Sequence, residues 1–272
     1  MNSNRSQSRL FSHADPSLLD DQASSLRRLV ASRPNQVIAF AGGARRCGRT
    51  TLVVEAARAL ARSGQQVIIV DENASDTNTW ALLGHTPEGD LIDALMIKTP
   101  LSQLVRAVEP NLWATYAPKA AVMLRFDSPK AVEIATTLIA PMEAAANFVL
   151  IDSLVLDGGH LSLLSAQAHH MVVVVSASAD AIQGAYAVIK RFAAERGRDG
   201  FYLAITGAES DAAAALIYGN VKKTAQRYLG VRVDFLANLG MPLPPDLDRI
   251  LLGGLPIISS RGRGLPSGNG LG

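Results

Sequence analysis

The sequence predicts a doubly wound α/β fold built on a mostly parallel sheet. From residue 37 onward, short and continuous apolar runs alternate with segments of helical periodicity. Continuous apolar strands are typical of a sheet that helices cover on both faces. A loop of the phosphate-binding type between a strand and a helix, and aspartates at the ends of two strands, are the second and third observations that favour this architecture.

A short amphipathic helix is expected before this fold. Residues 1–16 are polar and irregular, whereas residues 17–31 place Leu19, Ala23, Leu26 and Val30 at spacings of four, three and four. Ser17 can cap the start of the helix, with acidic residues near its beginning and arginines near its end, which suits the helix dipole. The sequence SRPNQ then ends the helix.

The remaining elements follow in order along one domain. Strands are expected at residues 37–41, 66–71, 147–153, 170–177, 201–208 and 231–239, and helices at 49–63, 181–196 and 212–229. The end of the chain is rich in glycine and proline, without a core-forming pattern after Ile258. We therefore expect an N-terminal tail and helix (1–35), one α/β domain (36–258) and a flexible tail (259–272).

Composition excludes several classes of protein. The 26 Lys and Arg residues nearly balance the 24 Asp and Glu residues, and a net charge of +2 does not indicate a nucleic-acid binder. One cysteine, Cys47, cannot form an internal disulfide, and the first thirty residues lack the pattern of a secretory signal. The apolar runs are too short to span a bilayer. These features predict a cytoplasmic protein whose membrane contact is weak or peripheral.

The loop from Gly43 to Thr50 matches the pattern G-x-x-x-x-G-K-[ST], except that arginine stands in the lysine position. In such loops, backbone N–H groups and a helix N-terminus bind phosphate, the lysine reaches the terminal phosphates, and the hydroxyl binds magnesium. The planar head of arginine does not replace a compact ammonium there. The expected nucleotide-binding residues are Gly43, Arg46, Cys47, Gly48, Arg49, Thr50 and Thr51, with ATP and Mg²⁺ as the ligands. The alternative is a solvated basic loop without a ligand.

Two acidic residues complete the expected metal site. Asp71 and Asp152 each end an apolar strand, at the edge where a doubly wound sheet places residues that face ligands. With Thr50, they form the expected magnesium ligand set. The alternative is that each aspartate only caps the turn that follows its strand.

These segments resemble the MinD/ParA class of P-loop ATPases and, within it, the flagellar-number regulator family FlhG, also called FleN. The segment DQASSLRRL at residues 21–29 is similar to the DQAxxLR element of FlhG, which in that family stimulates the GTPase FlhF. Segments 67–84, 181–192 and 220–239 resemble the switch region, the second-half helices and the last strand. By this resemblance, the partner-binding residues are Asp21, Gln22, Ala23, Leu26 and Arg27.

Departures from the family pattern concentrate on the nucleotide chemistry. The usual loop of the family is GKGGVGKT. In this chain, Ala44 stands at the position of the signature lysine, Arg45 and Arg46 stand at the positions of two glycines, and Arg49 stands at the position of the second lysine. Ala44 cannot supply the charge of the signature lysine, and the arginines would crowd the close backbone approach.

Asn73 stands where the family has the aspartate that orients the attacking water, so the catalytic position carries an amide that cannot accept a proton. The sequence DSLVL replaces DxPAG, and Thr206 replaces an adenine-contacting asparagine. The catalytic landmarks that remain are Thr50, Asp71 and Asp152.

The resemblance implies a FlhG-like regulator of flagellar number or placement that acts through protein partners and has weakened ATP binding and largely lost hydrolysis. The expected partners are an FlhF-type signal-recognition GTPase, a flagellar transcription regulator and a second copy of the chain, with no nucleic acid. Its expected location is the cytoplasm, with a peripheral position at the inner membrane or cell pole. The alternative is an active ATPase that switches between an ATP-bound dimer and a monomer. A DNA-partitioning protein is a third class, suggested by Lys190, Arg191, Arg196 and Arg198.

Overall fold

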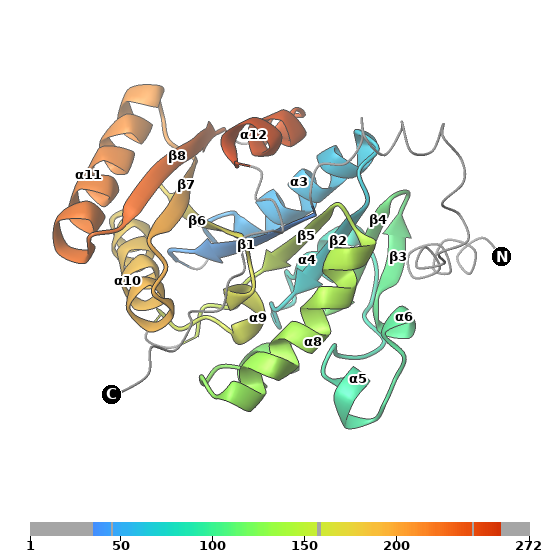
Figure 1. Cartoon of the computed structure of the whole chain (residues 1–272). Helices are drawn as coiled ribbons and strands as arrows, with labels where there is room; N and C mark the ends of the chain where they lie inside the picture. Colours follow the sequence, from blue (N-terminus) through green and yellow to red (C-terminus); the bar gives the residue numbers. More distant parts are fainter. Residues whose placement is uncertain (1–34, 45, 157–158, 241, 257–272) are drawn as a thin grey trace, which may run out of the picture.

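One eight-stranded sheet organises the protein, and the α/β prediction is confirmed. The computed structural model describes residues 35–44, 46–156, 159–240 and 242–256 (Figure 1). The strand order is β3-β4-β2-β5-β1-β6-β7-β8, and every neighbouring pair is parallel except β3 with β4. The strands are β1 (Gln36–Gly42), β2 (Val67–Asp71), β3 (Arg106–Glu109), β4 (Leu112–Tyr116), β5 (Phe148–Asp152), β6 (His170–Ser176), β7 (Gly200–Thr206) and β8 (Arg232–Leu239).

Helices connect most of the strands. They are α3 (Arg49–Arg62), α4 (Thr79–Leu83), α5 (Asp93–Met96), α6 (Leu101–Leu104), α7 (Pro118–Met123), α8 (Pro129–Ala145), α9 (Leu163–Ala166), α10 (Ala179–Arg196), α11 (Asp211–Leu229) and α12 (Leu247–Gly254). The three longest begin at a serine whose side chain accepts a hydrogen bond from a backbone N–H of the first turn: Ser128, Ser178 and Ser210. Such caps satisfy N–H groups that have no partner inside the helix.

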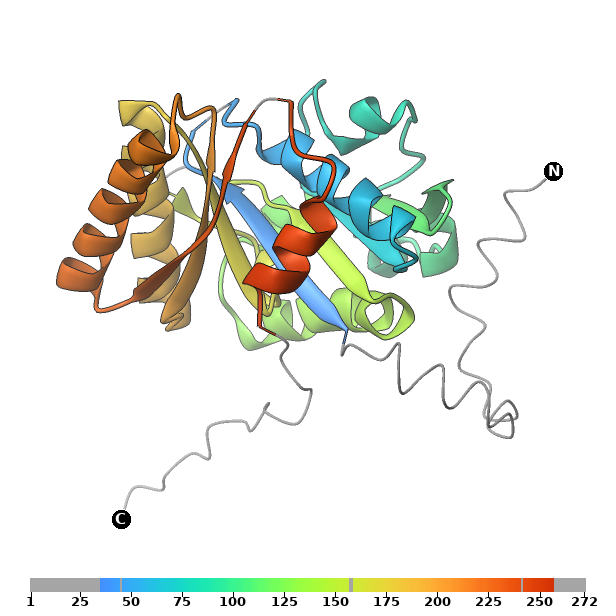
Figure 2. The same ribbon diagram turned by 90° about the horizontal axis from the view of Figure 1, so that it is seen from above.

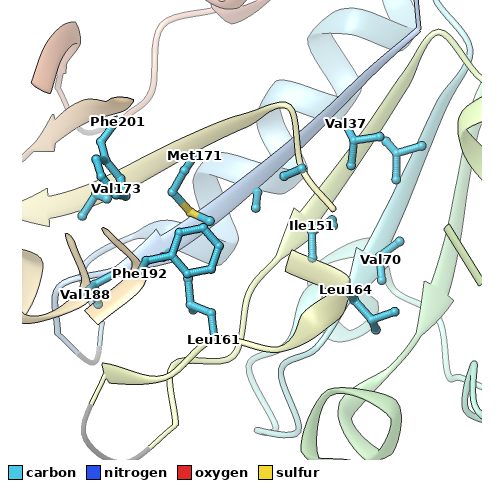
Figure 3. Packing of buried hydrophobic residues seen from close by; sticks show 14 of the residues in the cluster. Val37, Val70, Ile151, Leu161, Leu164, Met171, Val173, Val188, Phe192 and Phe201 are labelled. Atoms are coloured by element: carbon cyan, nitrogen blue, oxygen red, sulfur yellow. The ribbon is translucent and has the colours of Figure 1, made fainter. Parts of the chain in front are cut away.

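The sheet separates two apolar layers. Alternate residues of the strands face α3, α4 and α12 on one side and α8, α9, α10 and α11 on the other. Figure 1 shows α3 and α12 above the sheet and α8 and α9 below it, and Figure 2 looks onto the α3 and α12 side. In the second layer, Phe192 of α10 packs beside Met171 of β6 and Leu161 (Figure 3). Both faces of β1 and β5 are therefore buried, as their continuous apolar sequences predict.

The strand order creates a switch point beside β1. The chain leaves β1 through α3 toward β2 on one side, and it leaves β5 through α9 to reach β6 on the other side of β1. In open α/β sheets, ligands bind at the carboxyl ends of the strands where the direction of winding reverses. The loop that begins at Gly43 and the carboxylate of Asp152 both lie at this position.

The segment near the C-terminus is helical, although its glycines and proline predict an interrupted pattern. Helix α12 includes both Gly253 and Gly254, and its buried residues Leu247 and Leu251 join the α3 layer. Gly254 lies so close to β8 that a Cβ there would stand 2.6 Å from Leu236 Cδ1. Burial against the sheet and α3 outweighs the low helix propensity of glycine.

Two expected regions lie outside the described residues: the N-terminal helix with its partner-binding residues, and the tail from residue 259. The same holds for Arg45. Among the helices of the described segments, none is long and apolar enough to cross a membrane.

Candidate nucleotide-binding site

The phosphate-loop sequence adopts the backbone turns that such a loop requires. Gly48 has a φ of 83° and Arg46 a φ of 60°, both in the left-handed region. Glycine adopts this conformation without a steric penalty, and arginine only rarely. Gly48 is the N-cap of α3, so the loop passes directly into the helix and points its first N–H groups out of the helix end.

Close contact with α10 fixes the other end of the loop. A Cβ on Gly184 would lie 1.5 Å from the carbonyl oxygen of Gly43, and a Cβ on Gly43 would lie 2.2 Å from the carbonyl oxygen of Ala181. The two glycines therefore allow the loop and α10 to touch backbone to backbone. The N–H of Gly43 donates to Val174 O at 3.0 Å, which anchors the loop to β6.

Backbone donors at the start of α3 are available to a ligand. Within the described residues, the N–H groups of Gly48, Thr50 and Thr51 have no hydrogen-bond acceptor, and no side chain caps the helix. Unpaired N–H groups and the positive end of a helix dipole form an anion-binding site. This part of the site fits a phosphate group.

Arg49 does not point into this cradle as a free cation. Its guanidinium Nε donates to Asp152 Oδ1 in a short ion pair, in which the Asp152 side chain is fully buried. Burial by itself would lower the pKa of Arg49, but the Asp152 carboxylate reverses the effect and raises it. Thr50 Oγ1 donates to the second oxygen, Asp152 Oδ2, at 2.8 Å. Both oxygens of the expected metal ligand Asp152 are thus engaged by neighbouring side chains.

Asp71 lies opposite Asp152 in the register of β2 and β5. Asp71 accepts hydrogen bonds from the N–H groups of Asn73 and Thr79, each at 3.0 Å. Burial, together with the nearby charge of Asp152, raises the pKa of Asp71 to about 8.

Asn73 belongs to the same cluster. Its side-chain Nδ2 donates to Thr50 Oγ1 at 3.3 Å, and Thr50 in turn donates to Asp152. The structure therefore places Asn73 next to the expected metal-binding hydroxyl. In this arrangement the Asn73 amide is a donor to Thr50, and it has no carboxylate with which to accept a proton.

Thr206 also contacts the loop. Its hydroxyl donates to the carbonyl oxygen of Cys47 at 2.8 Å, and a Cβ on Gly48 would meet the Thr206 side chain first, at 3.8 Å. The position where the FlhG resemblance expects an adenine contact is thus used to hold the loop. Cys47 is buried and fills space beside Gly42, which is a packing role.

Sequence reasoning missed a buried polar network next to this site. Glu72 is fully buried, and its carboxylate accepts hydrogen bonds from the Leu154 N–H at 2.9 Å and from the Ser162 hydroxyl. Burial raises the pKa of Glu72 to about 7. In the sequence, the only signal for Glu72 is its position directly after Asp71, at the end of a strand.

These contacts decide which parts of Mg-ATP the site fits. The backbone cradle fits phosphate oxygens. The ligand set for magnesium does not fit in its present state, because Thr50 and Arg49 both engage the carboxylate of Asp152. In the described residues, there is also no group of three or more His, Cys, Asp or Glu side chains arranged to hold a metal ion.

Comparison with known proteins places the chain. No family model matches it. It is 23% identical over 211 residues to the antiactivator FleN of Pseudomonas aeruginosa, an alignment that covers 78% of this chain and 75% of FleN. The chain is similar to FleN in sequence and shares the fold of the MinD and ParA structures. Its sheet and helices match the cell division protein MinD of Aquifex aeolicus with a TM-score of 0.56 and 19% identity, over 82% of this chain and 88% of MinD.

A second solved structure with a similar fold contains a nucleotide. It is a putative plasmid partition protein from Borrelia burgdorferi bound to AMPPNP, with a TM-score of 0.59 and 15% identity, over 81% of this chain and 99% of that protein. The FleN-like chain therefore shares its fold with a protein that holds a nucleotide. Its own loop presents unpaired backbone N–H groups at the start of α3, while the Arg49 side chain pairs with Asp152.

Proposed function

We propose that this chain is a FlhG/FleN-type regulator of flagellar number or placement that acts by binding protein partners, with weakened ATP binding and largely lost hydrolysis. The observation that carries the proposal is the ion pair of Arg49 with Asp152. Arg49 stands in the lysine position of the loop and pairs with Asp152, the carboxylate of the expected metal site. The charges that would hold Mg-ATP therefore neutralise each other. Asn73 in the catalytic position supports the loss of hydrolysis.

The proposed partners follow from the FleN similarity and from the N-terminal motif. An FlhF-type GTPase would contact the segment with Asp21, Gln22, Ala23, Leu26 and Arg27. A flagellar transcription regulator and a second copy of the chain are the other proposed partners. We place the protein in the cytoplasm, with peripheral contact at the inner membrane or cell pole.

Deletion of residues 21–29 tests the partner assignment. The expected result is loss of stimulation of a purified FlhF-type GTPase, with an unchanged thermal unfolding curve of the α/β domain. A deletion of residues 2–12, which leaves the motif intact, is the matched control and should keep full stimulation. Equal stimulation by both truncated proteins would mean that the motif does not bind the GTPase.

The second candidate is an active MinD/ParA-type ATPase. The unpaired N–H groups of Gly48, Thr50 and Thr51 favour it, since they leave a phosphate cradle ready for use. In this candidate, ATP would displace Arg49 from Asp152 and free the carboxylate for magnesium. Titration of the protein with Mg-ATP separates the two candidates, because only the active ATPase should bind the nucleotide tightly.

A further inference from the structure

The carboxylate of Glu72 lies on the opposite side of the sheet from Asp71. Side chains alternate along a strand, so Asp71 faces the α3 layer while Glu72 follows Ile68 and Val70 into the layer of α8 and α9. There it is fully buried. Among the described residues, none forms an ion pair with Glu72, and its hydrogen-bond donors are all neutral.

These donors come from both ends of one loop. Leu154 begins the segment after β5 and donates its N–H to Glu72 Oε2 at 2.9 Å. Ser162 ends that segment and donates its hydroxyl to Glu72 Oε1. The Glu72 side chain, at the end of β2, thus accepts hydrogen bonds from both ends of the loop after β5.

Serines extend the network and fix the helix that follows. Ser162 Oγ accepts the N–H of Ser165 at 3.1 Å and so caps α9, while Ser165 Oγ lies 3.3 Å from each Glu72 oxygen and 2.7 Å from Ser153 Oγ. All three serines are fully buried. A buried carboxylate without a cation is costly unless several hydrogen bonds satisfy it, and here they do.

We propose that Glu72 is a positioning residue that latches the loop after β2 to the loop after β5, and that it holds Leu154 and Ser162, at the two ends of that loop, in place without a bound nucleotide. The loop after β5 carries Asp152 at its base, so a fixed loop also fixes the carboxylate that Arg49 and Thr50 bind. The latch belongs to the folded chain itself, and it can exist whether or not the protein binds ATP.

Hydrogen exchange of the full-length protein, measured without nucleotide, tests the latch. In Glu72→Ala the peptides that cover residues 153–166 should exchange about tenfold faster, because the Leu154 N–H loses its acceptor and Ser162 loses its anchor. Glu72→Gln has the same shape: its one oxygen can accept the Leu154 N–H and its NH2 group can donate to the Ser162 hydroxyl, so exchange should stay within about threefold of the wild-type rate. A tenfold rise in the exchange rate of Glu72→Gln as well would show that hydrogen bonds to a side chain of this shape do not hold the loop. That result would overturn the latch.

Asp90 provides the matched control. It is also buried, and it accepts hydrogen bonds from the N–H groups of Ile92, Lys119 and Ala120. Asp90→Ala should speed exchange near residues 117–124 and leave 153–166 unchanged. If Glu72→Ala fails to fold, Ser162→Ala replaces it and should speed exchange of the same peptides about threefold. Unchanged exchange at 153–166 in Glu72→Ala, or in Ser162→Ala where Glu72→Ala does not fold, would overturn the proposal.

Discussion

Arg49 and Asp152 form an ion pair across the switch point of the sheet, from the first residue of α3 to the last residue of β5. The carboxylate is fully buried, and the guanidinium is 14% exposed. In a phosphate loop of this type, the corresponding positions serve the nucleotide and its metal. In this chain, they satisfy each other, and the backbone donors at the start of α3 stay available to an anion.

Replacement of Arg49 by alanine should destabilise the fold. The change leaves the buried Asp152 carboxylate with Thr50 as its remaining side-chain donor, and removal of one partner from a buried pair costs about 3 kcal/mol or more. Urea unfolding measures the difference. Arg58→Ala is the control, because Arg58 pairs with Glu55 and Glu109 at the surface, where an ion pair contributes less than about 1 kcal/mol. Equal losses in the two variants would contradict the ion pair as described.

The contact between the loop that begins at Gly43 and helix α10 leads to a second prediction. Gly184→Ala places a Cβ 1.5 Å from Gly43 O, so the backbones must separate, and the free energy of unfolding should fall by about 3 kcal/mol. Gly219→Ala in α11 is the matched change, since nothing lies within 4 Å of its Cβ, and it should raise stability by about 1 kcal/mol. Thermal unfolding of both variants checks the pair. A neutral Gly184→Ala would mean that the close approach is absent.

His170 predicts a dependence of stability on pH. Its side chain is buried, its Nε2 lies 3.0 Å from Gln36 Oε1, and burial lowers its pKa to about 4 from 6.5. The nearby groups His169 and Arg198 contribute to this lowering of the pKa, and a hydrogen bond with the Pro256 backbone opposes it. The unfolded chain therefore binds the proton first, and stability that is full above pH 6.5 is lost as the pH falls toward 4.

Between pH 7 and pH 5, this residue should remove about 2 kcal/mol from the free energy of unfolding. His170→Gln keeps a donor for Gln36 and has no titrating ring, so its stability should fall by about 2 kcal/mol less over the same interval. Urea unfolding at the two pH values gives both differences. Parallel curves for wild type and His170→Gln would argue against a buried neutral histidine.

Much of the fold follows from the sequence because five of its strands are largely continuous apolar runs and β8 buries Val233, Ala237 and Leu239. The expected strands match β1, β2, β5, β6, β7 and β8, and the expected helices match α3, α10 and α11 to within about two residues at each end. The sequence patterns predict no elements between β2 and β5. There, β3 is a half-buried edge strand, α8 contains Pro141, and the other helices have six residues or fewer, so their patterns are weak.

The sequence predicts which residues come together at the candidate site, but it does not predict which of them contact one another. Thr50, Asp71 and Asp152 converge as their positions at a helix start and two strand ends predict. The Arg49 pair with Asp152 and the Glu72 bond to Ser162 join residues about ninety or more positions apart. Such contacts depend on which strands lie side by side, and a single sequence does not give that order.

Calorimetric titration with ATP and Mg²⁺, run beside a phosphate-release assay, tests the loss of nucleotide chemistry most directly. We predict that the wild-type protein binds Mg-ATP no tighter than about 1 mM, where a binding free energy is only about −4 kcal/mol, and releases no phosphate above background. The Arg49→Lys, Asn73→Asp double variant should also release none, because Ala44, Arg45 and Arg46 still replace the signature lysine and two glycines. Micromolar binding with measurable turnover by the wild-type protein would contradict this prediction and establish a working nucleotide switch.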